Sequence, residues 1–386
     1  MTEYRLEELF DLQMGKTPSR NNPEYWTSEN HKWISIGDLS RCGKYISETK
    51  ECLSEKAIKE SGISLIPAET VVMSFKLSIG KTAITAEPMY SNEAIMSFRD
   101  RGLVNLLPDY VYYLLSGRDW DEGTNKAVMG KTLNKATLSK IKVRIHDVEQ
   151  QKEIVSVLDL ISSIIASRQQ ELSALDDLIK ARFVEMFGDE TNPYNWPVIN
   201  VEEAANVSVG VVIKPAQYYT DAEHGVKAFR SLNVGPMYIK DGDWVYFSYE
   251  GNDKNAKSQL RENDLLIVRS GAPGTACVVP KQYEGCNAID IIIARPNTEK
   301  INPYYLCTYT NMPHGKRQID EGTGGAAQQH FNVGKYNKLR LFLPPLELQN
   351  EFVDFIAQVE KTKVAVQKAL DEAQVLFDSL MQQYFG

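Results

Sequence analysis

The sequence lacks the features that mark secreted, membrane and metal-binding proteins. It has five cysteines, none in a CxxC pair, and its five histidines do not pair with them at metal-ligand spacing. Its longest apolar stretch, from Ile154 to Ala166, is interrupted by Asp159 and falls short of the roughly 20 residues that a membrane helix needs. The first ten residues, MTEYRLEELF, are acidic and amphipathic, unlike a signal peptide. We therefore expect a cytoplasmic protein with reduced thiols.

Catalytic motifs are missing as well. GKT tripeptides begin at Gly15, Gly80 and Gly130, but none has the glycine five residues earlier that a phosphate-binding loop requires. The runs that start at Asn192 and Asn302 lack the second proline of the loop that holds the target base in amino-methylating enzymes. No carboxylate-x-lysine pair completes a nuclease site. The sequence therefore predicts no catalytic residue, no metal site and no cofactor bound by this chain.

What the sequence does contain is a tandem repeat, which is the first pattern to look for in a chain of 386 residues. At one offset of 198, Gln151 matches Gln349, and Leu133-Asn134 matches Phe331-Asn332. Upstream, the PxY motif that begins at Pro108 recurs at an offset of 195, and the WISI run from Trp33 aligns with FRSL from Phe229 at 196. The order is domain, helix, domain, helix.

The last segment of each repeat is predicted to be a long helix. Glycine and proline are absent from Glu149 to Phe187 and from Leu346 to Phe385, and apolar residues follow a seven-residue register. Three basic residues, Arg168, Arg182 and Lys363, interrupt this register, so we expect looser or salt-bridged packing there. The two helices are expected to run antiparallel because the second must return along the first. The alternative is two ordinary core helices in separate domains.

The repeat also explains the net charge of −8. Residues 146–188 and 344–386 each carry a net charge of −4, whereas residues 1–145 carry +1 and residues 189–343 carry −1. An acidic chain as a whole argues against nucleic-acid binding, but this excess acid lies in the helical segments. The flanking domains stay near neutral and keep basic loops.

The expected fold class is therefore α+β. Two mixed α/β recognition domains, residues 1–145 and 189–343, are separated by spacer helices at 146–188 and 344–386 that pack as an antiparallel coiled coil with an internal pseudo-two-fold repeat. Strands are expected at Lys32–Gly37, Thr70–Phe75, Leu265–Arg269 and Ala288–Ala294, and a short helix after each PxY motif.

The loops between these strands are candidates for contacting DNA. Base edges are read by side chains that form hydrogen bonds, and phosphates are held by basic and hydroxyl groups. The alternative for each single loop is an ordinary solvated turn. The candidates in the first domain are Lys16, Arg20, Lys76, Ser78, Lys81, Asn125, Lys126, Lys131 and Asn134. Those in the second domain are Lys214, Arg230, Arg269, Ser270, Thr323, Gln328, Gln329, His330 and Asn332.

On these residues the chain resembles the specificity subunits of type I restriction–modification systems. The most specific parts are EQQKEI from Glu149, the WISIGDL run from Trp33, SIGKTA from Ser78 and the FxxMFG and MQQYFG helix ends. The second domain departs from the pattern, since FRSL replaces the tryptophan run and APGT from Ala272 replaces SIGK.

The resemblance implies a mechanism. Each domain would read one half of a split double-stranded DNA target, and the helices would set the gap between the halves. Two methyltransferase subunits would dock on the helices and domains and methylate adenine, and motor–nuclease subunits would join for cleavage. S-adenosylmethionine, ATP and magnesium would then bind these partners. The alternative is a coiled-coil scaffold whose two domains bind proteins. An enzyme would need a nucleotide or metal site that the sequence does not offer.

Overall fold

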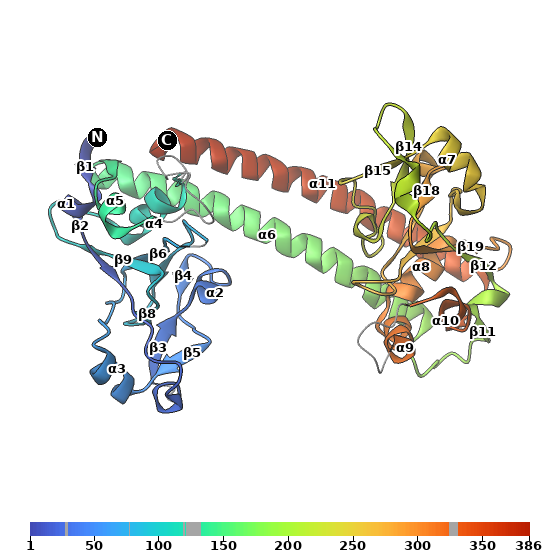
Figure 1. Ribbon diagram of the computed structural model, residues 1–386, viewed down its shortest axis with the longest axis horizontal. Helices are drawn as coiled ribbons and strands as arrows, with labels where there is room; N and C mark the ends of the chain where they lie inside the picture. The colour runs from blue at the N-terminus through green and yellow to red at the C-terminus, as the bar shows by residue number, and fades with distance from the viewer. Residues whose placement is uncertain (28–29, 77, 119, 121–132, 324–330) are drawn as a thin grey trace. The chain divides into compact units, whose positions relative to one another are not determined.

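A computed structural model describes residues 1–27, 30–76, 78–118, 120, 133–323 and 331–386. The chain divides into two compact units (Figure 1). Unit 1 comprises Met1–Gln169 and Gln367–Gly386, and unit 2 comprises Gln170–Val366. This division cuts through both long helices, whereas the sequence analysis put the boundaries at the helix ends. Each unit therefore contains one recognition domain and a part of each helix.

The two long helices are confirmed. They are α6 (Val148–Phe187) and α11 (Leu346–Phe385), each of 40 residues, or about 60 Å at about 1.5 Å per residue. Both end in a Phe-Gly pair, as the repeat predicts. Gly188 has a φ of 82°, a conformation that glycine adopts without strain, and its N–H donates to the Val184 carbonyl at 2.8 Å. None of the helices in the described part of the chain combines the length and apolarity that a bilayer span requires.

Unit 1 is a mixed α/β domain, as expected. Its strands are β1 (Thr2–Arg5), β2 (Phe10–Met14), β3 (His31–Ile34), β4 (Tyr45–Ile46), β5 (Glu51–Leu53), β6 (Val71–Ser74), β7 (Thr82–Thr85), β8 (Tyr90–Ser91), β9 (Ile95–Asp100) and β10 (Lys142–Ile145). Its shorter helices are α1 (Leu6–Leu9), η1 (Pro23–Tyr25), α2 (Ile36–Leu39), α3 (Glu55–Ser61), α4 (Pro108–Ser116) and α5 (Lys135–Ser139). The sheets have the orders β2-β9-β6-β7-β4, β5-β3-β8 and β1-β10.

Unit 2 repeats this plan. Its strands are β11 (Val198–Asn200), β12 (Ala205–Val209), β13 (Tyr219–Thr220), β14 (Gly225–Phe229), β15 (Val245–Ser248), β16 (Leu265–Val268), β17 (Ala276–Val278), β18 (Asn287–Ala288), β19 (Ile291–Pro296) and β20 (Arg340–Phe342). Its shorter helices are η2 (Val201–Glu203), η3 (Pro215–Tyr218), η4 (Ser231–Asn233), α7 (Tyr249–Lys254), η5 (Ala256–Ser258), η6 (Lys281–Tyr283), α8 (Pro303–Asn311), α9 (Pro313–Thr323) and α10 (Val333–Asn337). The sheets have the orders β12-β19-β16-β17, β13-β15-β14-β18 and β11-β20.

The sheet orders confirm the repeat and correct its alignment in one place. The order β2-β9-β6-β7 corresponds to β12-β19-β16-β17, and the parallel pair β3–β8 corresponds to β14–β18. After β3, the N–H of Ser35 donates to the Asp38 carboxylate at 2.9 Å; after β14, the N–H of Arg230 donates to the Asn233 side-chain oxygen at 2.9 Å. The offset here is 195, so the alignment at 196 was one residue out.

A buried glutamine fixes the start of each long helix in the same way. Gln151 accepts from the Leu107 N–H at 3.0 Å and donates to the carbonyls of Asn105 and His146 at 2.9 and 3.0 Å. Gln349 accepts from the Asn302 N–H at 2.8 Å and donates to the carbonyls of Pro344 and Lys300 at 2.9 and 3.4 Å. Both side chains are fully buried. An amide is needed because it satisfies one backbone donor and two acceptors at once.

Each unit is closed by the C-terminal end of a long helix. In unit 1, the ring of Phe385 packs on Tyr110 of α4, with 5.4 Å between ring centroids. In unit 2, Phe187 packs on Tyr305 of α8 at 4.8 Å. These two tyrosines are the last residues of the PxY motifs, and the two phenylalanines match at the offset of 198. The same structural contact therefore recurs, made by α11 in unit 1 and by α6 in unit 2.

The helix segments run antiparallel within each unit. In unit 2, Phe183 of α6 packs on Phe352 of α11. Seven residues earlier on α6, Asp176 pairs at 2.9 Å with Lys363, which lies eleven residues later on α11. The two helices therefore run in opposite directions. The expected salt-bridged packing is found at Lys363 and at Arg182. Lys363 pairs with Asp176 and Glu360, and Arg182 pairs with Glu185 at 2.9 Å and Glu351 at 3.4 Å. The burial of Ile154, Leu158 and Ile161 shows the same apolar face of α6 in unit 1.

Candidate nucleic-acid interface

Five of the candidate residues of unit 1 lie on two loops next to the strand pair β3–β8. The first loop follows β2, and a side chain at Gly15 would collide with the Ser91 carbonyl, so only glycine fits. The next residue, Lys16, is exposed, and its backbone N–H donates to that carbonyl at 2.8 Å. The Thr17 hydroxyl donates to Glu93, which follows β8. The loop is thus tied to the strand pair β3–β8.

Arg20, on the same loop, is held by two kinds of contact. Its guanidinium meets the Glu51 carboxylate through two hydrogen bonds of 2.5 and 3.0 Å. It also stacks over the Trp26 ring at 3.7 Å and lies 4.9 Å from the Trp33 ring. These contacts fix the orientation of the guanidinium before binding, so the arginine side chain loses little conformational entropy when it binds a ligand. Its remaining N–H donors are available for a phosphate or a base.

The second loop is the turn between β6 and β7, which carries Lys76, Ser78 and Lys81. Gly80 has a φ of 89°, and its N–H donates to the Ser74 carbonyl at 2.9 Å, which closes the turn. Ser78 is exposed, and Lys76 and Lys81 are partly exposed. The hydrogen bond from Thr17, with the charges of Lys76 and Arg20, lowers the pKa of the Glu93 carboxyl. Glu93 thus accepts a hydrogen bond from the first loop and interacts electrostatically with Lys76 of the second.

Unit 2 has the same arrangement with different side chains. Asp290 stands in the place of Glu93, directly after the parallel strand pair, and it forms a salt bridge with Arg269 at the start of the β16–β17 turn. The Arg269 Nε–H donates to the Phe331 carbonyl at 3.1 Å. The Asp290 N–H in turn donates to the Val211 carbonyl at 3.2 Å. One carboxylate and one guanidinium thus connect all three candidate loops of unit 2.

The structure gives several predicted DNA contacts a clear local role. Asn134 and Asn332 begin α5 and α10, and their side chains accept from the N–H groups of Thr137 at 2.8 Å and Lys335 at 3.0 Å. Arg230 begins η4, and its guanidinium donates to the Asp243 carbonyl. Arg269 is 16% exposed and already paired. These four side chains support the loops from within the fold.

The remaining predicted residues divide into two groups. Lys214 is exposed and has a φ of 47°, and Ser270 is half-buried in the β16–β17 turn. Thr323 is the last residue of α9. Outside the described residues lie Asn125, Lys126, Lys131, Gln328, Gln329 and His330, together with the side chain of Thr323.

Sequence reasoning missed the residues that hold the loops together. Glu93 and Asp290 were not predicted, because a single acidic residue in a basic loop does not indicate a role in DNA binding. The two residues also match each other only when the repeats are aligned by their strands. Trp26 was missed too, although an arginine six residues before a tryptophan, in a short loop, is compatible with stacking. The asparagine caps had a signal, since Asn134 is followed three residues later by Thr137.

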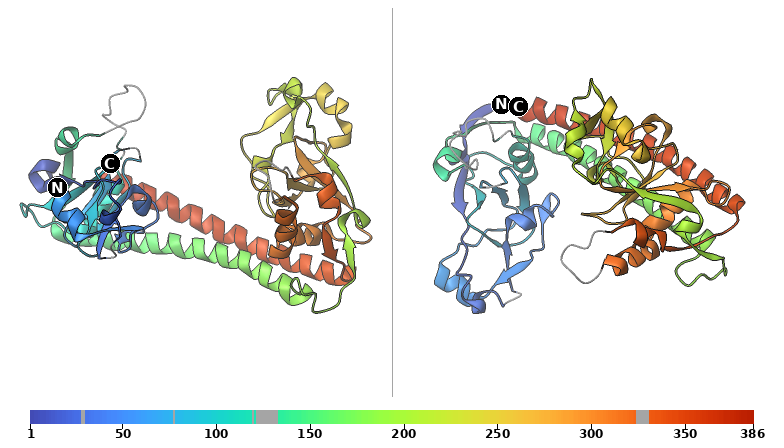
Figure 2. Two further views of the ribbon diagram at one scale, coloured as in Figure 1. Left: turned by 60° about the horizontal axis from the view of Figure 1, so that its bottom comes forward. Right: turned by 45° about the vertical axis from the view of Figure 1, so that its right-hand side comes forward.

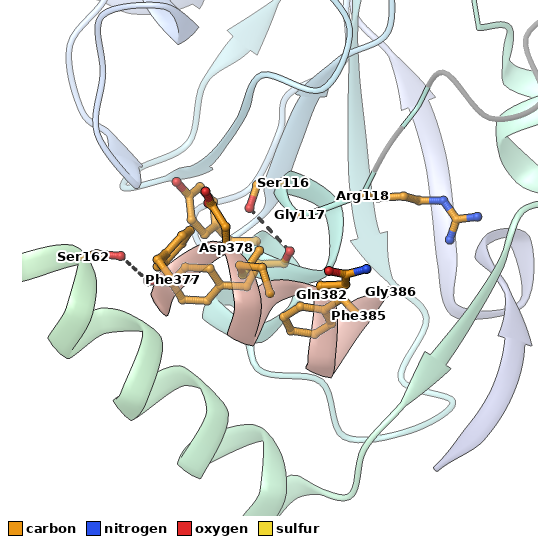
Figure 3. Close-up of a pocket in the computed structure, with 12 residues that line it drawn as sticks. Ser116, Gly117, Arg118, Ser162, Phe377, Asp378, Gln382, Phe385 and Gly386 are labelled. Atoms are coloured by element: carbon orange, nitrogen blue, oxygen red, sulfur yellow. Dashed lines mark hydrogen bonds between the residues drawn. The ribbon is translucent and has the colours of Figure 1, made fainter. Parts of the chain in front are cut away.

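A groove of about 760 Å³ in unit 1 lies away from these loops (Figure 3). Its walls come from the end of α4, including Ser116 and Gly117, and from the end of α11, including Phe377 and Phe385. The groove contains none of the predicted site residues. Within the described ranges, no group of three or more His, Cys, Asp or Glu side chains is arranged to hold a metal.

The fold and the loop surfaces thus define a class: a duplicated recognition protein with two loop clusters and two long helices. Comparison with known proteins gives the family. The family model for the type I restriction modification DNA specificity domain matches residues 1–177. The MjaIX specificity subunit of Methanocaldococcus jannaschii is 20% identical over 98% of this chain and 90% of its own length. The EcoprrI specificity subunit of Escherichia coli is 21% identical over 89% of this chain and 84% of its own length.

Solved structures agree at the level of the fold. The type I S subunit from M. genitalium aligns over 100% of this chain and 96% of its own, with a TM-score of 0.53 at 14% identity. A chain from a study of complex assembly and conformational transition of the type I R-M system aligns over 100% and 97%, with a TM-score of 0.60 at 15% identity. Residues 1–177 therefore match the type I restriction modification DNA specificity domain, and the chain as a whole is similar to the specificity subunits of type I restriction enzymes.

Proposed function

We propose that each unit reads one half of a bipartite DNA target through its candidate loops. The observation that carries this proposal is a recurring carboxylate two residues after the parallel strand pair: Glu93 accepts from Thr17 on the first loop of unit 1, and Asp290 pairs with Arg269 on the β16–β17 turn of unit 2. The side chains that the loops present differ, as two different half-sites require. Lys16, Lys76 and Lys81 in unit 1 supply positive charge for phosphates.

The target itself is tested by sequencing modified bases in a host with and without the gene. A modified split motif that disappears with the gene is expected. If no such motif depends on the gene, the proposal fails; binding of other proteins without DNA would favour the scaffold alternative.

The phosphate-binding role is tested in the purified full chain. Lys76→Ala should weaken binding to target and non-target duplexes alike and reduce the slope of log K against log salt by about 0.9, one phosphate contact. Lys59→Ala is the control, because Lys59 carries the same charge and is exposed but lies on α3, outside the candidate loops. A salt slope that changes equally in both variants would contradict the assignment.

We further propose that the long helices dock two methyltransferase subunits and a motor–nuclease subunit. The support is an apolar stripe on α6 at helical spacing, formed by Val157, Leu160 and Ile164, which are 39%, 62% and 40% exposed. A solvent-facing stripe of this kind favours a protein partner, and the net charge of −4 on the segment disfavours DNA. The proposal assigns S-adenosylmethionine, ATP and magnesium to those partners, and assigns the complex to the cytoplasm.

Docking is tested by co-purification with a methyltransferase subunit. Leu160→Glu should abolish it, while Ser173→Glu, which adds the same charge at an exposed position on another face of α6, should leave it intact. Loss of co-purification in both variants would indicate a charge effect and reject the stripe as the docking surface.

The spacer role is tested by inserting four residues after Ala166, about 6 Å of helix. The gap in the modified motif should lengthen. The same insertion after Gly102, in an exposed loop, is the control and should leave the gap unchanged. An unchanged gap after the helix insertion rejects the ruler role.

A further inference from the structure

The loop after β12, one of the three candidate loops of unit 2, exposes apolar side chains. Ile213 is 78% exposed and Val212 is 50% exposed, and no other large hydrophobic side chain in the described ranges is as exposed as Ile213. Exposing an isoleucine forgoes the roughly 25 cal/mol per Å² that burial contributes. Ile213 therefore contributes little to the stability of the hydrophobic core.

The same loop in unit 1 has a different length and chemistry. Between its glycine and its proline, unit 1 has only Lys16 and Thr17, whereas unit 2 has the four residues from Val211 to Lys214. The loop of unit 2 is thus two residues longer and presents apolar groups where unit 1 presents a charge. Equivalent loops that differ in length and side chains are expected if the two units read half-sites of different sequence.

The longer loop is held firmly at both ends. The Val211 N–H donates to the Ala288 carbonyl at 2.7 Å, and its carbonyl accepts from Asp290. At the other end, the Lys214 carbonyl accepts from the Gln217 N–H at 3.2 Å, Lys214 adopts a left-handed conformation with φ 47° and ψ 51°, and Pro215 follows. Asp290 also binds Arg269, so this loop is one of the three candidate loops that these two residues connect in unit 2.

We propose that Ile213 reads a thymine in the half-site of unit 2 by packing against its 5-methyl group in the major groove. This inference rests on the proposed DNA-reading function. The thymine methyl is the apolar feature that the major groove presents to a protein, so an aliphatic side chain among polar loops selects it. Lys214, the adjacent residue, is exposed and supplies a charge for the neighbouring phosphate.

The experiment removes the methyl group and leaves all hydrogen-bonding groups in place. The full chain, with its methyltransferase subunit if that is needed for binding, is used to select targets from duplex libraries made with thymidine and with deoxyuridine. With the wild-type chain, one thymine of the unit 2 half-site should bind about fourfold more weakly when it is replaced by uracil, the effect of one methyl group.

Ile213→Ala should weaken binding to the thymine duplex about tenfold and make the thymine and uracil duplexes equal. Leu103→Ala, which truncates a residue 57% exposed between β9 and α4, away from the long helices and the candidate loops, is the matched control and should keep the fourfold difference. Because Ile213 is exposed, both variants should unfold at the wild-type temperature.

The outcomes separate the two levels of the proposal. If the wild-type chain enriches no sequence, the DNA-reading function fails and this inference fails with it. If it enriches a target but no thymine responds to uracil, or if Ile213→Ala keeps the fourfold difference, only the inference is wrong. Loss of methyltransferase binding by Ile213→Ala, with the thymine preference intact, would assign the loop to a protein partner.

Discussion

The two units receive the end of a long helix at equivalent sites but pack it differently. In unit 2, Phe183 of α6 is fully buried among Phe187, Tyr305, Tyr309 and Phe352. In unit 1 the matching residue is Met381 of α11, and Met312 of unit 2 is replaced by Gly117. The groove of about 760 Å³ opens at this point, lined by both Met381 and Gly117 (Figure 3). In both units the Phe-Gly end of a long helix packs on a buried tyrosine, and this contact is compatible with either loose or dense packing around it.

The largest expected effect tests this difference directly. Phe183→Ala should destabilise unit 2 by about 4 kcal/mol, because a buried ring leaves a cavity among other rings. Met381→Ala should destabilise unit 1 by only about 2 kcal/mol, because its side chain already borders a groove. Hydrogen exchange measured by mass spectrometry follows peptides of both units separately. Equal losses would show that the two helix ends are packed alike.

Acid should sharpen the contrast between the units. Burial lowers the pKa of His314 in unit 2 to about 4, and its Nε2 has no hydrogen-bond partner among the described residues. The imidazole is then neutral in the folded state and charges more readily in the unfolded state. Unit 2 should keep its full stability above pH 6.5 and lose about 3 kcal/mol as the pH falls to about 4.

The control for the acid effect is His314→Phe, which fits between the stacked rings of Phe183 and Phe342. Urea unfolding between pH 7 and 4 should show that this variant has lost most of the pH dependence of unit 2. Burial also lowers the pKa of His146 in unit 1, so unit 1 should lose stability in the same direction. A variant that keeps the wild-type pH dependence would show that other groups carry it.

The smallest effect should be the same in both units. Gln151→Met and Gln349→Met each remove three hydrogen bonds to buried backbone groups while nearly conserving volume. We expect each to cost about 2 kcal/mol, measured by hydrogen exchange in its own unit. Unequal losses would mean that the two glutamines do not hold their helices in equivalent ways.

The helices and the repeat could be predicted because they depend on local pattern. The two helical segments lack glycine and proline and repeat apolar residues every seven positions, and this local pattern favours a helix. The PxY motifs begin α4 and α8 as expected. The antiparallel direction followed from connectivity. The sequence alignment of the repeats was one residue out near Phe229 because it matched similar residue types. The structure instead matches the capping pairs that follow the strand, Ser35–Asp38 in unit 1 and Arg230–Asn233 in unit 2.

The loop surfaces could be predicted only as regions. Arg269 was chosen as a DNA contact because it is basic and in a loop, but its partner Asp290 lies on another loop 21 residues later, and no local pattern joins them. Asn134 and Asn332 were chosen for their amide groups, which the helix caps use. The exposure of Ile213 could not be predicted from the sequence, because an apolar run after a strand suggests that the strand continues.

The way α11 ends in unit 1 has a consequence for biosynthesis. Unit 2 is one continuous stretch of chain, whereas the core of unit 1 includes Met381 together with residues near the start of the sequence, such as Leu6. Although domains generally fold in order as they leave the ribosome, unit 1 here is completed only when its last twenty residues are made. During translation, the second recognition domain should therefore reach its final packing before the first.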